Sequence, residues 1–263
     1  MARRSLAGAR TLVTGASSGI GRALARELAN RGARLLLTAR REDRLRELVD
    51  EIRSQGRDAS FFAGDIADSD CRRQLIELAN ERLGGLDIVV NNAGIGGVGR
   101  FDQANEQRVR QIFEVNFFAP VELTRLALPL LRTGNRPLIV NIGSVLGHCA
   151  VPLKSEYSAS KFALHGFSDA LRCELASDRI DLLLVSPSTT SSEFFDHTGA
   201  SDESIAKRRY RAMTPEAVAR KTVRAMERGQ REIILSVGGK LLVWCDRLFP
   251  TLTNWLLTKF AQS

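Results

Sequence analysis

Short apolar segments alternate with amphipathic segments along the chain, and this alternation limits the possible folds more than any other feature. Each apolar run is apolar on both faces and bounded by turn residues, which is typical of strands in a parallel sheet covered on both sides. The predicted strands are residues 11–15, 35–39, 59–65, 86–92, 138–144, 182–187 and 231–235. The segments between them have helical periodicity. A repeated strand-then-helix order gives right-handed crossovers, so the chain is predicted to form a doubly wound α/β sheet.

No linker, composition break or internal repeat divides the 263 residues. We therefore expect a single Rossmann-like domain over residues 1–239 with helices on both faces of its sheet, followed by a helical tail over residues 240–263. The longest helical pattern, from about residue 104 to residue 131, contains Pro120. Proline lacks the amide hydrogen that an α-helix needs, so we expect a distortion or a break close to Asn116.

Composition narrows the functional classes. The four cysteines are far apart and lack metal-ligand spacing, so no metal site is expected. No segment has the ~18 apolar residues of a membrane span or the apolar run of a signal peptide, which favours the cytoplasm. The net charge of +8 fits solubility, an anionic ligand or an anionic surface. Nucleic acid is not expected as a partner, because no compact basic tract contains aromatic residues.

A glycine-rich turn follows the first predicted strand. Gly15, Gly19 and Gly21 lie in TGASSGIG (residues 14–21), directly before a predicted helix. Glycines at this position allow a tight turn and let the backbone approach a pyrophosphate, while the helix N-terminus directs N–H groups at it. In a doubly wound sheet this arrangement indicates a dinucleotide site.

The end of the second predicted strand bears on the choice of dinucleotide. An acidic side chain there would bind the adenosine ribose hydroxyls, but the sequence has Ala39, Arg40 and Arg41. Because a guanidinium pairs with a 2′-phosphate, we expect NADP(H) to be preferred over NAD(H), with Arg40 in contact. The alternative is that these arginines form a solvated helix start.

Tyr157 and Lys161 form a candidate acid–base pair in YSASK (residues 157–161). Residues four apart share one face of a helix. Tyrosine has a pKa of about 10, and a nearby ammonium group should lower it. Thirteen residues earlier, Ser144 ends a predicted strand, where its hydroxyl would meet the oxygen on which the tyrosine acts.

These motifs resemble those of the short-chain dehydrogenase/reductase family. TGASSGIG, NNAG (residues 91–94), Asn116, Ser144 and YSASK occur in the family's order and spacing along most of the chain. The resemblance implies a nicotinamide-dependent oxidoreductase acting on a carbonyl or a secondary alcohol. Such enzymes often form homodimers or homotetramers, which we expect here.

The resemblance also implies roles for individual residues. Tyr157 would be the general acid or base, and Lys161 would lower its pKa and hold the nicotinamide ribose. Ser144 would polarise the substrate oxygen, and Asn116 would help to hold a proton-relay water. The residues implied in cofactor binding, besides Tyr157, Lys161 and Arg40, are Gly15, Ser17, Ser18, Gly19, Ile20, Gly21, Asp65, Asn92, Ala93, Gly94, Pro187 and Ser192. The local alternative is structural, with Asp65 as a helix cap and Asn92 as a turn former.

The chain departs from the family pattern after the sixth predicted strand. Pro187 is kept, but Ser188 replaces a glycine and Ser192 replaces a threonine that contacts the nicotinamide carboxamide. Serine adopts positive φ less readily than glycine, so the backbone path at residue 188 is open to question. By the same resemblance, residues 193–213 would form a lid over the substrate. The substrate pocket is expected to include His148, Leu153, Phe194 and Phe195.

The tail carries a helical stripe of apolar residues that runs from Leu241 to Phe260 and is divided by Pro250. Lys240, Arg247 and Lys259 flank the stripe, as in helices at a membrane surface. A membrane surface, a dimer interface and packing on the chain's own core are all compatible with this pattern. Membrane contact would favour a lipid-like or steroid-like substrate.

Two other functional classes remain as alternatives. One is a non-catalytic cofactor sensor or scaffold on the same fold, although Tyr157, Lys161 and Ser144 are all present. The other is a basic protein that binds membranes or nucleic acid through its charge.

Overall fold

The computed structural model describes residues 3–188, 190 and 212–262. Within this part of the chain, seven parallel strands form one sheet in the order β3-β2-β1-β4-β5-β6-β7. The strands are β1 (Arg10–Thr14), β2 (Arg34–Ala39), β3 (Ala59–Ala63), β4 (Ile88–Asn91), β5 (Leu138–Ile142), β6 (Asp181–Ser186) and β7 (Glu232–Ile234). The predicted α/β fold with a doubly wound parallel sheet is confirmed.

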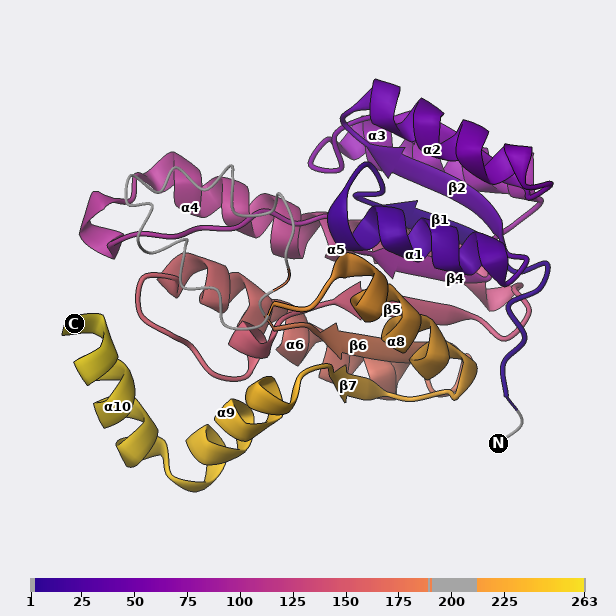
Figure 1. Ribbon diagram of the computed structural model, residues 1–263. Coiled ribbons are helices and arrows are strands. Elements are labelled where there is room, and N and C mark those ends of the chain that lie inside the picture. Colours follow the sequence, from indigo (N-terminus) through magenta and orange to yellow (C-terminus); the bar gives the residue numbers. More distant parts are fainter. Residues whose placement is uncertain (1–2, 189, 191–211, 263) are drawn as a thin grey trace.

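Helices cover both faces of the sheet (Figure 1). One face is covered by α1 (Gly19–Asn30), α2 (Glu42–Ser54) and α8 (Pro215–Glu227). The other is covered by α3 (Ser69–Leu78), with its π-helical extension η1 (Ala79–Leu83), and by α5 (Ala119–Arg132) and α6 (Ser155–Glu174). Both helical layers therefore bury the sheet, which explains why its strands are apolar without alternation.

Strand β2 shows how the two cores form. Leu35 and Leu37 belong to the core under α1 and α8, whereas Leu36 belongs to the core under α3 and α5. Successive strand residues point to opposite faces, so a run of leucines fills both cores. All three side chains are fully buried.

The strand order reverses between β1 and β4. Chain connections on the two sides of this point lead in opposite directions. In doubly wound sheets, ligands bind at such a point, outside the carboxyl ends of the strands. The turn after β1 and the NNAG segment after β4 meet there. The fold thus places both motifs at its expected ligand-binding edge.

The long helical pattern is broken as expected. Helix α4 (Glu106–Phe113) leads into the π-helical segment η3 (Glu114–Phe118), and α5 then begins with Pro120 in its first turn. In a continuous α-helix the Asn116 carbonyl would accept a hydrogen bond from the N–H of residue 120. Proline cannot supply this bond, and the helix is widened around Asn116.

The C-terminal tail forms two helices, α9 (Val237–Leu248) and α10 (Pro250–Gln262), separated at Pro250. Figure 1 shows them as an arm that extends beyond β7. Helix α9 packs on the 3-10 turn η4 (Val145–Gly147), and α10 packs on α9. None of the helices in the described part of the chain has the length and apolar character needed to cross a bilayer.

Candidate active site

The glycine turn is closely packed against the end of β4. A Cβ at Gly21 would lie 2.2 Å from the Gly15 carbonyl oxygen and 2.4 Å from Asn92 Nδ2. Gly15 also has a φ of +67°, which side chains disfavour. Both glycines are therefore required by the local packing.

The N-terminus of α1 suits an anion. Its N-cap residue, Ser18, makes no side-chain capping bond, and no acidic residue lies in the first turn. The helix dipole and the first N–H groups are therefore available to a negatively charged group. The residues of the turn fit the pyrophosphate of a dinucleotide.

Asn92 ties the end of β4 to this turn. Its Nδ2 donates hydrogen bonds to the carbonyl oxygens of Thr14 at 2.9 Å and Gly15 at 3.2 Å. The Ala93 N–H donates to Thr14 Oγ1 at 3.0 Å. Farther along the segment, an added Cβ at Gly94 would lie 3.2 Å from Asn116 Oδ1 and 3.7 Å from Lys161 Nζ. The NNAG segment therefore spans the distance from the glycine turn to the proton-transfer residues.

The two arginines after β2 have different surroundings. Arg41 reaches the glycine turn, where its guanidinium donates to Ser18 Oγ at 2.7 Å and Ser17 Oγ at 3.2 Å. Arg40, the residue singled out from sequence, is exposed. Both arginines follow the strand end at which an adenosine ribose would lie. Of the two, Arg41 is held in place by its hydrogen bonds to the serines of the turn.

Asp65 forms a local turn at the end of β3. Its carboxylate accepts a hydrogen bond from the Ala67 N–H at 3.0 Å, and the side chain is exposed. The N-cap of α3 is a different residue, Asp68, which accepts from the Asp70 N–H. An exposed Asp65 carboxylate keeps lone pairs for another donor, so the turn is compatible with a cofactor contact.

Ser144 and Tyr157 meet at the carboxyl end of β5. Ser144 caps η4 by accepting a hydrogen bond from the Leu146 N–H at 3.0 Å. Tyr157 lies in the first turns of α6 and is 7% exposed. Burial raises the pKa of Tyr157 to about 12, and its hydrogen bond with Ser144 acts in the opposite direction. Tyr157 is therefore protonated at neutral pH.

Lys161 lies one turn after Tyr157 and is 4% exposed. Its Nζ donates to the Ile142 carbonyl oxygen at 2.9 Å and lies 5.9 Å from the centre of the tyrosine ring. Burial lowers the pKa of Lys161 to about 8. The expected lowering of the tyrosine pKa is not found, because the desolvation of the buried phenol outweighs the hydrogen bond with Ser144.

Asn116 joins three segments of the site. Its Oδ1 accepts from the Ile95 N–H at 2.8 Å, and its Nδ2 donates to the Ile95 carbonyl at 2.9 Å and to Ser160 Oγ at 3.0 Å. These bonds use the side chain to hold Ile95, directly after the NNAG segment, against α6. The backbone carbonyl, which lacks an α-helical donor at Pro120, is the remaining candidate to accept a bond from a water.

The segment after β6 supports the catalytic loop. The Pro187 carbonyl accepts a hydrogen bond from the Val145 N–H at 2.9 Å. Among the described residues, the non-glycine residues with positive φ are Arg136, Leu153 and Arg179, so Ser188 fits here without a left-handed conformation. The expected contacts of Ser192, Phe194 and Phe195 lie outside the described residues.

His148 does not line an open pocket in this conformation. Its side chain is fully enclosed, with Nε2 at 2.9 Å from Ser186 Oγ and 3.1 Å from Glu232 Oε1. The His165 ring packs against it, and His165 Nδ1 donates to the Gly147 carbonyl at 3.0 Å. In the described part of the chain, these two histidines and Glu232 have side-chain N and O atoms of the kind that coordinate metal ions, and these atoms lie within 4.8 Å of one another. Their hydrogen bonds tie η4 to α6 and β7, a role that sequence spacing did not reveal.

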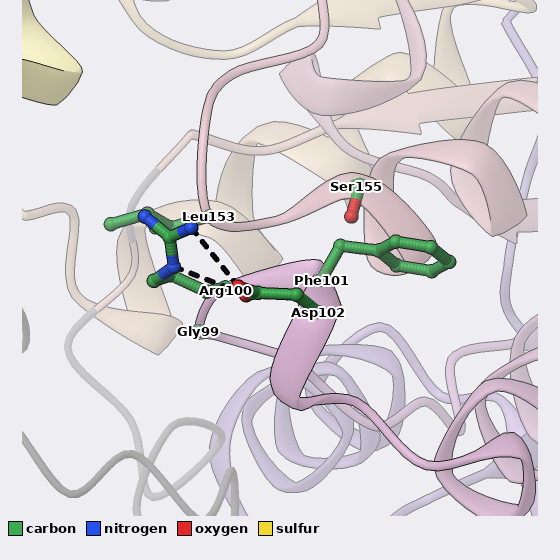
Figure 2. A pocket seen from close by; sticks show the side chains of 6 residues that line it. All are labelled: Gly99, Arg100, Phe101, Asp102, Leu153 and Ser155. Carbon is green, nitrogen blue, oxygen red and sulfur yellow. Dashed lines mark hydrogen bonds and ion pairs between the residues drawn. The ribbon is translucent and has the colours of Figure 1, made fainter.

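A surface hollow lies beside the start of α6. It has a volume of about 390 Å³ and is lined by Gly99, Arg100, Phe101, Asp102, Leu153 and Ser155 (Figure 2). The Gly99 N–H donates to the Leu153 carbonyl at 2.9 Å, which joins the loops after β4 and β5. Leu153, which precedes Tyr157 by four residues, therefore lines a surface hollow.

A buried ion pair next to the tyrosine was missed from sequence. Arg108 Nη2 on α4 lies 2.6 Å from Glu156 Oε1, and the Glu156 side chain is 1% exposed. The two residues are 48 positions apart, so no local pattern connects them.

Comparison with known proteins identifies the family. The model of the short chain dehydrogenase family matches residues 9–203. The chain belongs to the short-chain dehydrogenase/reductase family. The "11-beta-hydroxysteroid dehydrogenase A" of Sesamum indicum, a named relative, is 34% identical over 265 residues, which cover 95% of this chain and 75% of that protein.

Two solved structures are similar to this family member. A short-chain dehydrogenase from Burkholderia cenocepacia J2315 in complex with NADP has a TM-score of 0.80 and 30% identity over 90% of this chain and 100% of that one. A family member from Burkholderia phymatum in complex with NAD has a TM-score of 0.86 and 23% identity over 95% and 96%. The first is a relative in sequence and fold, and the second shows the fold. Each of these two proteins holds a nicotinamide dinucleotide in its solved structure.

Proposed function

We propose that this short-chain dehydrogenase is an NADP(H)-dependent oxidoreductase that reduces a hydrophobic ketone or oxidises the corresponding secondary alcohol. The observation that carries the proposal is the enclosed Tyr157, which is hydrogen-bonded to Ser144 and backed by Lys161 at the carboxyl edge of the sheet. A tyrosine on a solvated helix face would have none of these features.

The chain's own residues provide binding and proton transfer. When bound, the cofactor supplies or accepts the hydride at its nicotinamide ring. Ser144 donates a hydrogen bond to the substrate oxygen and orients it. Tyr157 donates its phenolic proton to that oxygen during reduction, or removes the proton during oxidation.

Lys161 and Asn116 support this proton transfer. Lys161 Nζ lies 5.9 Å from the centre of the Tyr157 ring, and both Lys161 and Asn116 border Gly94. As an ammonium group it stabilises the phenolate that remains after proton donation. A water on the Asn116 carbonyl would return a proton through Lys161.

The raised pKa of Tyr157 favours carbonyl reduction in the neutral range. A protonated phenol is ready to donate, whereas alcohol oxidation requires the phenolate. A carbonyl substrate therefore matches the resting protonation state of the site.

The arginines after β2 support the choice of NADP(H). Arg41 is fixed against the serines of the glycine turn, and the exposed Arg40 precedes it. A 2′-phosphate at this edge would meet two guanidinium groups and no carboxylate from Ala39 to Arg41. The NADP-bound relative at 30% identity supports the same choice.

The hydrophobic substrate class is supported by the name of the steroid dehydrogenase relative and by the apolar tail. Self-association into a homodimer or homotetramer is supported by two phenylalanines that face solvent, Phe118 at 49% and Phe162 at 43% exposure. Cytoplasmic location, with peripheral membrane contact through the tail, completes the proposal.

Calorimetry with NADPH and NADH tests the cofactor assignment. We expect the wild-type protein to bind NADPH more tightly. Arg41→Ala should weaken NADPH binding by about 10- to 100-fold and leave NADH binding unchanged, because a charge-assisted bidentate contact contributes about 1.5–3 kcal/mol. Arg40→Ala tests the expectation from the sequence that Arg40 contacts the 2′-phosphate. Arg46→Ala is the matched control, since Arg46 pairs with Glu42 on the surface of α2. Equal affinity for the two cofactors would overturn the NADP(H) assignment.

Turnover with Tyr157→Phe tests the enzyme assignment. NADPH oxidation in the presence of hydrophobic ketones should be abolished in this variant, while its NADPH affinity is retained. If wild-type protein binds NADPH but reduces none of a broad ketone panel and oxidises none of the matching alcohols with NADP⁺, the chain is a cofactor sensor or scaffold instead.

A further inference from the structure

The outer face of the two-helix tail is a large apolar surface. On α9 it comprises Val237, Leu241, Trp244 and Leu248, which are 58% to 77% exposed. Phe249, at the C-cap of α9, and Leu252, Trp255 and Leu256 on α10 are 52% to 60% exposed. We call these eight residues the tail face. Exposed apolar residues that gather in this way mark a contact surface.

The tail face is directed away from the chain's own core. On α9 the buried residues are Gly239 and Val243, which lie on the opposite side of the helix from Leu241 and Leu248. Asp246 lies on the buried side as well, where it hydrogen-bonds Cys149. Helix α9 is thus packed by its inner side on the catalytic domain and still presents an apolar outer side. The domain itself does not cover the tail face.

Cationic side chains border the tail face. Lys240 and Arg247 follow one edge of the α9 stripe, and Lys259 Nζ lies 3.9 Å from the centre of the Trp255 ring. Asp246 is the only acidic residue from residue 237 to the C-terminus, and it is turned to the core. The tail face therefore combines apolar residues, two tryptophans and a positive border.

This charge pattern separates two possible occupants. In a two-fold dimer each patch packs on its own copy, so Lys240, Arg247 and Lys259 would face a patch that offers cations and no outward carboxylate. An anionic bilayer offers the opposite charge, and its interface accommodates tryptophan and lysine beside buried leucines. We propose that the tail face is a docking surface for an anionic lipid bilayer, on which α9 and α10 lie without crossing it.

Docking would place the active site close to the lipid. Helix α9 packs on η4, the turn that Ser144 caps. A bilayer in contact with the tail is then adjacent to the loop that holds the catalytic serine. This arrangement suits a substrate that partitions into membranes, although the docking surface itself does not depend on catalysis.

The chain provides its own probe for this proposal, because both of its tryptophans, Trp244 and Trp255, lie in the tail face. Vesicles of equal parts phosphatidylcholine and phosphatidylglycerol should shift the tryptophan emission to shorter wavelength and sediment the protein. Vesicles of phosphatidylcholine alone should bind about 100-fold more weakly, given about a fivefold contribution per cation near an anionic surface. High salt should reverse the binding, since the charges are exposed.

Two sets of variants identify the contacts. Neutralising the border with Lys240→Gln, Arg247→Gln and Lys259→Gln together should remove the preference for phosphatidylglycerol. Arg57→Gln, Arg224→Gln and Arg228→Gln together are the charge-matched control, because these arginines are exposed and lie outside the tail. Leu248→Ser with Leu252→Ser should abolish vesicle binding and leave NADPH turnover in solution unchanged.

Sedimentation velocity without lipid provides the opposing result. Suppose that the wild-type protein binds neither kind of vesicle and forms an oligomer that the double variant Leu248→Ser, Leu252→Ser does not form. The tail face is then an interface between copies of this chain. Equal binding to both kinds of vesicle would overturn the anionic requirement. The vesicle experiment is read out by tryptophan emission and sedimentation, not by turnover. A negative result therefore leaves the oxidoreductase proposal intact, and an absence of turnover leaves the docking proposal intact.

Discussion

Arg108 and Glu156 form an ion pair that fixes α4 against the start of α6, one residue before Tyr157. The contact is 2.6 Å long, and the two side chains are 24% and 1% exposed. Glu156 Oε2 also accepts a hydrogen bond from Ser155 Oγ at 2.9 Å. The carboxylate is thus held from both sides, and the backbone that carries Tyr157 is held with it.

Removing the arginine should be costly, because it leaves an enclosed carboxylate without its cation. We expect Arg108→Ala to lower the free energy of unfolding by about 2–4 kcal/mol, measured by urea titration. Arg110→Ala on the same helix is the control. It breaks an exposed pair with Glu106 and should cost ~0.5 kcal/mol or less. Adding Glu156→Gln to Arg108→Ala should recover part of the loss; a double variant no more stable than Arg108→Ala would contradict this explanation.

Pro120 is expected to matter for catalysis more than for stability. Pro120→Ala provides an N–H that can close an α-helical bond to the Asn116 carbonyl and narrow the π-helical segment. Removing the acceptor for a relay water should lower kcat by about tenfold or more, since proton transfer contributes 10²–10⁴-fold. Pro129→Ala, at an exposed position inside α5, is the control and should leave kcat unchanged. An unchanged kcat in Pro120→Ala would mean that the carbonyl plays no part in the relay.

The pH dependence of reduction should follow Lys161. Burial lowers the pKa of Lys161 to about 8, whereas Tyr157 stays protonated up to about 12. The ammonium group is present below the lower value and lost above it. We therefore expect kcat/KM for NADPH, which reports the cofactor-free protein, to decline as the pH rises above about 8. A profile that stays level to pH 10 would show that the charge on Lys161 is not required.

The glycine turn should tolerate no side chain at Gly21. Gly21→Ala places a Cβ against the backbone carbonyl of Gly15 and the side-chain amide of Asn92, which hydrogen-bonds the same turn. We expect NADPH affinity to fall by at least 100-fold in calorimetry, because either the turn or Asn92 must move. Gly166→Ala on α6 is the matched control. Nothing lies within 4 Å of its added Cβ, and the helix should gain ~0.5–1 kcal/mol of stability. Equal cofactor affinity in both variants would show that the turn adapts.

Local patterns in the sequence determined the elements of this fold and their order. Apolar runs of strand length between amphipathic segments predicted the strands to within two residues at each end, because burial on both faces leaves a continuous apolar signal. Pro120 predicted the break in the long helix, since its missing N–H acts within one turn. The spacing of Tyr157 and Lys161 placed them on one face of α6 for the same local reason.

Tertiary packing decided which side chains meet across distant segments. Arg41, and not the singled-out Arg40, contacts the glycine-turn serines because the direction of a side chain after β2 depends on how α1 packs beside it. Enclosure by β6 and β7 gave His148 a structural position, and the Arg108–Glu156 pair joins residues that no periodicity relates. Burial, which only the folded chain produces, raised the pKa of Tyr157 where the neighbouring lysine alone predicted a decrease. The sequence also showed that the tail is amphipathic, but only the packing of α9 on η4 revealed that its apolar side faces outward.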